Sequence, residues 1–399
     1  MTTLAAPPGR GRRSTGTGWY LAAVTSIRTA SLRPRLAALD GLRLVAAVAV
    51  LSYHYAGINV PFWGPPSHVV FPTISHVGRY GYLGVNLFFV ISGFVILMTA
   101  YDRRIESFAA SRVARLYPAY WVAIVLTVGL QHFWHEGRTP SSVEGLVNLT
   151  MVQEAFDITN VQGAFWTLWI ELKFYLLIGV FILVGMTRRR VLAFAVLWPL
   201  VGQIANATGA KFLNSLLIPT YAPYFAAGIL LFLLFRERHD VATLLALAFN
   251  WVLCIRQATA YAPRASHLTD SHVSALVIGV IVTLSMVAVY LCSFGPVSRL
   301  SWRWLTVAGA LTYPLYLVHG QLGFFFIDTL HDQVSPYAVL AIATASAFVL
   351  AYAINRLVER PLAPRLRRAV QAALVDTTTN VTSAAREEPA PGRSGARTR

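Results

Sequence analysis

The chain has 399 residues, of which 56% are hydrophobic and 13% are charged, and its mean hydropathy is +0.56. Soluble domains carry about 25% charged residues, so this composition excludes an ordinary soluble protein and favours one that crosses a bilayer many times. The formal net charge is +16, but the arginines lie in short loops and tails between apolar segments and form no continuous basic surface. We therefore expect no nucleic-acid partner.

The N-terminal segment, residues 1–35, is rich in Arg, Gly, Ser and Thr and contains no apolar stretch long enough for a membrane span. We interpret it as a disordered basic tail in the cytoplasm. The chain has two cysteines, which indicate neither a disulfide framework nor a zinc site.

Apolar segments of suitable length follow, and they predict an all-α, polytopic membrane bundle with about ten transmembrane helices. Basic residues concentrate in every second connection, as at 103–104, 188–190, 236–238 and 299–303. Because cytoplasmic loops carry an excess of Lys and Arg, this alternation predicts a multi-pass protein of the plasma membrane with both termini in the cytoplasm. The predicted spans are 38–58, 80–100, 114–134, 166–186, 191–207, 215–235, 241–258, 272–294, 304–327 and 336–357.

The first span carries Arg43 and His54, which lie eleven positions apart. Eleven positions are about three helical turns, so both side chains point in the same direction, roughly 16 Å apart along the axis. Arg43 lies near the cytoplasmic end and His54 in the outer half. Ionisable groups inside a bilayer are costly, and we read this pair as functional rather than as a snorkelling arginine with a packed histidine.

Three further polar residues fall at the expected depth of His54, each on a different span: Asn86, Glu171 and His319. At 1.5 Å per residue, Glu171 and Asn86 lie about 7 and 9 Å below the outer ends of their helices. A shared depth on four helices predicts a common polar site within the membrane.

A second cluster is expected at the cytoplasmic level. Arg112 and Arg115 lie three positions apart at the start of the third span, hence on one helix face. Guanidinium groups bind phosphates bidentately, although a pair of arginines at this level is also ordinary positive-inside charge. Together with Arg43 they suggest a dock for a phosphate-rich carrier whose thin arm extends toward His54, which is the shape of coenzyme A.

Six motifs, in this order, resemble the acyltransferase-3 family of integral-membrane O-acyltransferases: "LDGLRLVAAVAVLSYH", "GYLGVNLFFVISGF", "RVARLYP", "WTLWIELKFY", "LTYPLYLVH" and "NRLVERP". The resemblance implies an acyltransferase membrane domain over residues 36–365, followed by a disordered C-terminal tail over 366–399. It implies that Arg43 and His54 are the essential pair, that Arg112 and Arg115 bind acyl-CoA, and that Glu171 is the family's acidic residue. Many members have Asp where this chain has Asn86, so a charged base is not expected there.

The implied reaction moves an acyl group, by default acetyl, from acyl-CoA to a hydroxyl of a carbohydrate or a glycosylated natural product. We expect His54 to act as general base, with a covalent acyl-histidine as the alternative. Glu171 is expected to orient His54 or to bind the acceptor, and Asn86, Tyr313 or His319 to bind substrate at the developing oxyanion. We expect acyl-CoA as co-substrate, no permanently bound cofactor and no metal.

Two other classes fit part of the pattern. Ten spans with intramembrane His and Glu are also typical of a proton-coupled secondary transporter, although the chain has no convincing internal repeat. A catalytically silent scaffold is the third possibility, and it would tolerate the loss of His54.

Overall fold

The computed structural model describes residues 36–137, 139–237 and 239–387, with side chains up to residue 376. Ten helices in this part of the chain are long and apolar enough to cross a membrane, which confirms the predicted all-α bundle. The predicted tail 1–35 lies outside the described residues. The helices are α2 (Ala37–Ser52), α3 (Ser67–Val70), α4 (Ile74–Gly78), α5 (Leu83–Ala100), α6 (Ile105–Phe133), α7 (Ser142–Asn148), α8 (Trp166–Val184), α9 (Arg188–Ala207), α10 (Lys211–Leu217), α11 (Ala222–Arg236), α12 (Val241–Ala260), α13 (Ala262–Thr269), α14 (Ala275–Ser293), α15 (Arg303–Leu330), α16 (Pro336–Ile354) and α17 (Arg360–Glu387).

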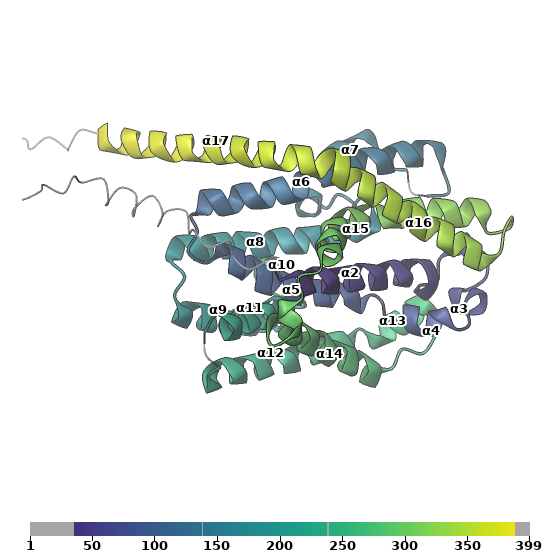
Figure 1. Ribbon diagram of the computed structural model, residues 1–399, viewed down its shortest axis with the longest axis horizontal. Coiled ribbons are helices and arrows are strands. Elements are labelled where there is room, and N and C mark those ends of the chain that lie inside the picture. The colour runs from purple at the N-terminus through teal and green to yellow at the C-terminus, as the bar shows by residue number, and fades with distance from the viewer. Residues whose placement is uncertain (1–35, 138, 238, 388–399) are drawn as a thin grey trace, which may run out of the picture. The chain divides into compact units, whose positions relative to one another are not determined.

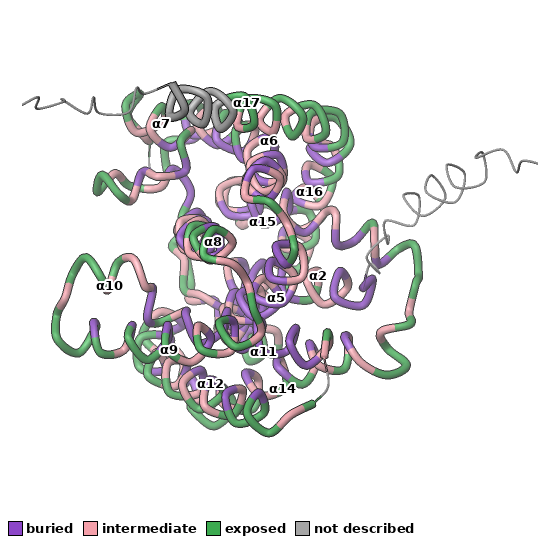
Figure 2. The backbone as a smooth tube through the Cα atoms, turned by 90° about the vertical axis from the view of Figure 1, so that its left-hand side faces the viewer, coloured by how far each residue is buried: buried purple, intermediate pink, exposed green. Residues whose placement is uncertain are grey.

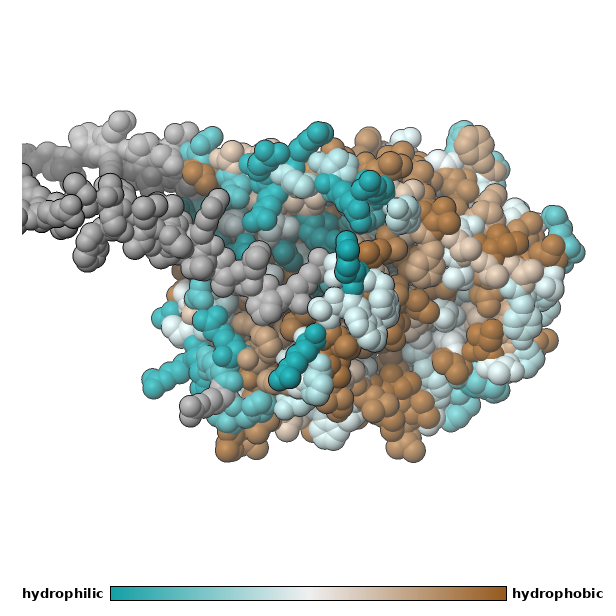
Figure 3. Space-filling view, in the orientation of Figure 1, coloured by the Kyte–Doolittle hydropathy of each residue, from teal (hydrophilic) through white to brown (hydrophobic). Residues whose placement is uncertain are grey.

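The long helices run side by side, so the bundle has two ends (Figure 1). We call the end where α2 and α6 begin the arginine end, at the left of Figure 1, and the opposite one the histidine end. Viewed along the helices, α2, α5, α8 and α15 lie near the centre, with α6, α16 and α17 on one side and α9, α11, α12 and α14 on the other (Figure 2). Hydrophilic residues gather toward the arginine end, and apolar residues cover much of the remaining face (Figure 3).

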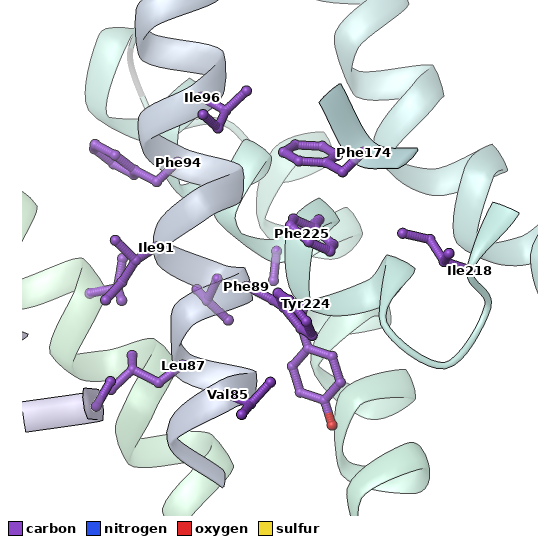
Figure 4. Packing of buried hydrophobic residues seen from close by; sticks show 14 of the residues in the cluster. Val85, Leu87, Phe89, Ile91, Phe94, Ile96, Phe174, Ile218, Tyr224 and Phe225 are labelled. Atoms are coloured by element: carbon purple, nitrogen blue, oxygen red, sulfur yellow. The ribbon is translucent and has the colours of Figure 1, made fainter. Parts of the chain in front are cut away.

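Two glycines let α5 and α11 approach closely at the core of the bundle. A Cβ on Gly93 would lie 2.1 Å from the Phe225 carbonyl oxygen, and one on Gly228 would lie 2.0 Å from that of Val90. Small residues permit such close contact between membrane helices. Aromatic rings fill the space around the contact, where Phe174 and Phe225 stack with centroids 4.2 Å apart (Figure 4). The core between α5, α8 and α11 is therefore closely packed.

The C-terminal segment differs from the expected disordered tail over 366–399. α17 continues the chain as a helix through Glu387, and residues 388–399 lie outside the described part. Ala363, Leu366, Val370 and Leu374 recur every three or four positions and are half-buried, and α17 packs on α6. This apolar stripe is the physical reason for the helix, and it was hidden by the polar composition of the segment.

Asp240 joins the starts of α9 and α12 at the arginine end. Its carboxylate caps α12 by accepting from the Thr243 N–H at 3.1 Å, and it also binds the Thr243 hydroxyl and the Arg188 guanidinium. Hydrogen bonds from Thr243 and from Arg188 lower the pKa of Asp240 to about 2.

Candidate active site

Three arginines line a cavity of about 110 Å³ between α2, α5, α6, α8 and α15, which we call the arginine chamber. Arg43 reaches it from α2, while Arg112 and Arg115 reach it from one face of α6. The carboxylate among its described lining residues is that of Glu171. Asp40 and Glu359 lie just outside this lining, 3.7 Å from Arg43 and from Arg115. The three guanidiniums that line the chamber are the groups suited to an anionic ligand.

Aromatic rings and a buried carboxylate hold these arginines in place. The Arg112 guanidinium lies 5.8 Å from the centroid of the Tyr175 ring. One terminal nitrogen of Arg115 lies 3.7 Å from Oε1 of Glu359. Glu359 belongs to a π-helical turn, Asn355–Glu359, is buried, and accepts from the Asn355 amide at 2.6 Å. Arg115 is therefore positioned by a carboxylate that is itself fixed.

Glu171 lies in the arginine chamber and not beside His54. Its carboxylate accepts hydrogen bonds from the Ser92 hydroxyl, at 3.0 Å, and from the Tyr175 hydroxyl. We expected Glu171 to orient His54 or to bind the acceptor; the ring partner of His54 in the structure is His319.

His54 lines a second cavity, of about 350 Å³, at the histidine end, which we call the histidine chamber. The residue sits in a π-helical turn, Tyr53–Gly57, that ends α2. Such turns frequently occur at functional sites. The π-helical turn is held by the Tyr55 hydroxyl, which donates to the His319 carbonyl at 2.6 Å. It also packs closely on Gly78, because a Cβ on Gly57 would lie only 2.4 Å from the Gly78 carbonyl oxygen.

The imidazole of His54 contacts that of His319, and their partners assign the ring protons. His319 Nδ1 lies 2.8 Å from the Tyr316 carbonyl oxygen and must donate to it, so Nε2 of neutral His319 accepts. His54 Nδ1 lies 2.9 Å from the Val50 carbonyl oxygen and 3.2 Å from His319 Nε2, so it carries its proton and donates to both. The lone pair of His54 is therefore on Nε2, the nitrogen that a general base needs free.

Tyr316 and Val85 line both chambers and lie between them. The Tyr316 hydroxyl is 2.7 Å from the Thr167 hydroxyl and 3.0 Å from the Ala164 carbonyl oxygen, which holds the ring in place. Arg43 and His54 thus belong to adjoining cavities, with one aromatic side chain at the junction.

The remaining predicted substrate-binding residues are divided between the two chambers. Asn86 lines the histidine chamber, whereas His319 is buried outside the described lining of both chambers and contacts His54. Tyr313 instead lines the arginine chamber and donates to the Leu116 carbonyl oxygen at 3.0 Å, so the structure places it away from His54. Sequence reasoning missed Tyr316 and Glu359, although both lie within motifs that it singled out.

Comparison with known proteins gives the same family along most of the chain. A family model described as an acyltransferase domain matches residues 36–356. The chain is 31% identical over 150 residues to acyltransferase MdmB of Streptomyces mycarofaciens, covering 36% of this chain and 38% of that protein. It is 28% identical over 172 residues to peptidoglycan O-acetyltransferase OatA of Listeria monocytogenes, covering 38% of this chain and 25% of that protein. The matches therefore span well under two thirds of these relatives.

No solved structure gives a significant match. The family match covers both the arginine chamber and the histidine chamber. The chain belongs to the acyltransferase-3 family of membrane acyltransferases.

Proposed function

We propose that the protein transfers an acyl group, acetyl by default, from acyl-CoA to a hydroxyl of a carbohydrate or of a glycosylated natural product. One observation carries the proposal: a cationic cavity and a cavity with a correctly protonated histidine share lining residues. The phosphates of coenzyme A bind at Arg43, Arg112 and Arg115. The thin pantetheine arm extends through the arginine chamber and carries the thioester toward Tyr316, which lines both chambers.

In the transfer step, Nε2 of His54 takes the proton of the acceptor hydroxyl as the oxygen attacks the thioester carbonyl. The carbon–sulfur bond then breaks, and the coenzyme A thiolate takes the proton from the imidazolium. General-base catalysis of this kind contributes about 10²–10⁴-fold. The Val50 carbonyl and His319 Nε2 together hold the proton of His54 on Nδ1.

The sides of the membrane follow from the donor. Acyl-CoA is a cytoplasmic metabolite, so the arginine end faces the cytoplasm and the histidine end faces outward in the plasma membrane. The names of the relatives support a sugar acceptor, because one of them acts on peptidoglycan.

The experiment measures release of the coenzyme A thiol from acetyl-CoA by protein in liposomes, with a panel of glycans and glycosylated natural products as acceptors. Replacing Arg112 and Arg115 together by Ala should raise the Michaelis constant for acetyl-CoA. The matched control replaces Arg367 and Arg368, two exposed arginines of α17, and should leave that constant unchanged. An unchanged Michaelis constant in the Arg112/Arg115 variant would mean that these arginines do not bind acetyl-CoA and only mark the cytoplasmic side of the membrane. Solute uptake driven by a pH gradient without acetyl-CoA would indicate a transporter.

A further inference from the structure

We infer that the histidine chamber is the acceptor site and that it is built for an uncharged sugar ring. This inference rests on the proposed acyl transfer and adds the chemical class of the acceptor. The volume of the histidine chamber, about 350 Å³, falls at the lower end of the range for small-molecule sites. The chamber therefore accommodates a single small unit of a larger acceptor beside His54.

Aromatic rings supply the faces on which a sugar would lie. One cluster of rings consists of Tyr53, Tyr82 and Tyr261. The ring centroid of Tyr82 lies 5.5 Å from that of Tyr53 and 5.3 Å from that of Tyr261. Trp166 and Tyr221 form another, with centroids 5.3 Å apart. The C–H faces of a pyranose are apolar, and the electron-rich face of an aromatic ring attracts their weakly positive hydrogens.

Polar groups between the rings suit the hydroxyls of a sugar. The amides of Asn86 and Gln257 line the chamber; Gln257 Nε2 also donates to Gln203 at 2.8 Å, and Asn86 bonds Tyr224, which leaves each amide further hydrogen-bonding capacity for a ligand. The Tyr82 hydroxyl is buried and has no hydrogen-bond partner among the described residues. This oxygen has almost no accessible surface, so Tyr82 contributes its ring rather than its hydroxyl to the chamber.

The described lining of the histidine chamber contains no Asp, Glu, Lys or Arg. The adjoining arginine chamber is lined by three arginines and one glutamate, so the two chambers of this protein differ sharply in charge. A uronic acid or an amino sugar would lose hydration in the histidine chamber without gaining an ion pair. A neutral sugar loses far less hydration free energy, so this lining favours neutral sugars over charged ones.

The test measures sugar binding in the absence of acyl-CoA, by ligand-observed NMR on the full chain in nanodiscs. The probes are methyl glycosides of the gluco, galacto and manno series, each as the neutral sugar, the uronic acid and the 2-amino sugar. We expect the neutral member of at least one series to bind about tenfold or more tightly than its charged counterparts. Equal or tighter binding of the charged sugars, or no binding of any probe, would overturn the inference.

Variants locate the binding. Trp166→Ala should weaken binding of the neutral probe about tenfold, because the stacking face is lost, and Trp166→Phe should retain most of it. Trp251→Ala is the matched control, since Trp251 lines a separate groove between α12 and α14. Asn86→Asp, which adds a carboxylate with little change in shape, should shift the preference toward the amino sugar. Binding that ignores Trp166 and Asn86 would place the acceptor elsewhere.

Failure of the proposed function has a different signature. Acetyl-CoA titrated into the same nanodiscs reports on the arginine chamber alone. Sugar binding without acetyl-CoA binding or thiol release would overturn the acyl transfer, whereas thiol release stimulated by charged sugars would overturn only the inference on neutral acceptors.

Discussion

Replacing His319 by Ala tests the histidine pair directly. The change removes the Nε2 acceptor that lies 3.2 Å from His54 Nδ1 and leaves the Val50 carbonyl as the other acceptor. A hydrogen bond of this kind contributes about 0.5–1.5 kcal/mol, which corresponds to roughly two- to twelvefold in a rate. We therefore expect kcat to fall by about that factor in His319→Ala, compared with about 10²–10⁴-fold in His54→Ala, which removes the base itself.

The assay is thiol release from acetyl-CoA in liposomes at saturating acceptor, across a range of pH. The Michaelis constant for acetyl-CoA should not change, because the arginine chamber is untouched. His319→Gln restores an acceptor oxygen and should recover part of the lost rate. Replacement of the exposed His239 is the matched control and should leave kcat unchanged.

The melting temperature of each variant shows whether the protein is folded, since His319 is buried. A folded His319→Ala protein that is as slow as His54→Ala, or that changes only the Michaelis constant, would refute the assignment of the ring protons.

Three further predictions concern the rest of the bundle. Glu359→Gln removes the carboxylate partner of Arg115 and should raise the Michaelis constant for acetyl-CoA about two- to fivefold at unchanged kcat. Gly228→Val drives a side chain into α5 and should destabilise the protein by about 1–3 kcal/mol, whereas Gly129→Ala, which meets open space, should not, as thermal melting would show. Because the native pKa of Asp240 is about 2, its stabilisation is complete above pH 3.8, its ordinary pKa, and declines as pH falls toward 2; Asp240→Asn should remove this part of the acid sensitivity.

Each of these predictions has a control or a contrary outcome. The control for Glu359→Gln is Asp332→Asn, which changes an exposed carboxylate in the connection between α15 and α16, away from the arginine chamber. It should leave the Michaelis constant for acetyl-CoA unchanged. A fall in kcat alone in Glu359→Gln would mean that Glu359 does not act through Arg115. Equal melting of the two glycine variants would contradict the close approach of α5 and α11. An Asp240→Asn protein with the acid profile of the parent would contradict the lowered pKa.

Hydropathy and motif order were sufficient for the class of fold. The ten predicted spans correspond to ten helices of the described residues, because an apolar run of this length has few other stable structures. α17 was missed because its apolar stripe is diluted by arginines, and only packing on α6 makes it significant.

The candidate site was predictable in its residues and less so in their grouping. Arg112 and Arg115 were placed together by their spacing on a helix, and the structure keeps them together. Depth along a helix says nothing about direction around it, so the sequence did not show that Glu171 and Tyr313 line the arginine chamber. The contact between His54 and His319 depends on a π-helical turn, which shifts the side-chain direction and leaves no clear mark in the sequence.

Tyr316 also determines how the protein affects the membrane around it. If the polar cavities toward the two ends of the bundle merged, they would form a continuous water-filled path across the bilayer. The tyrosine ring, held by Thr167 and the Ala164 carbonyl, lies between the two cavities. In the proposed reaction the thioester arm must pass this ring, and the proton that His54 takes from the acceptor hydroxyl leaves on the coenzyme A thiol.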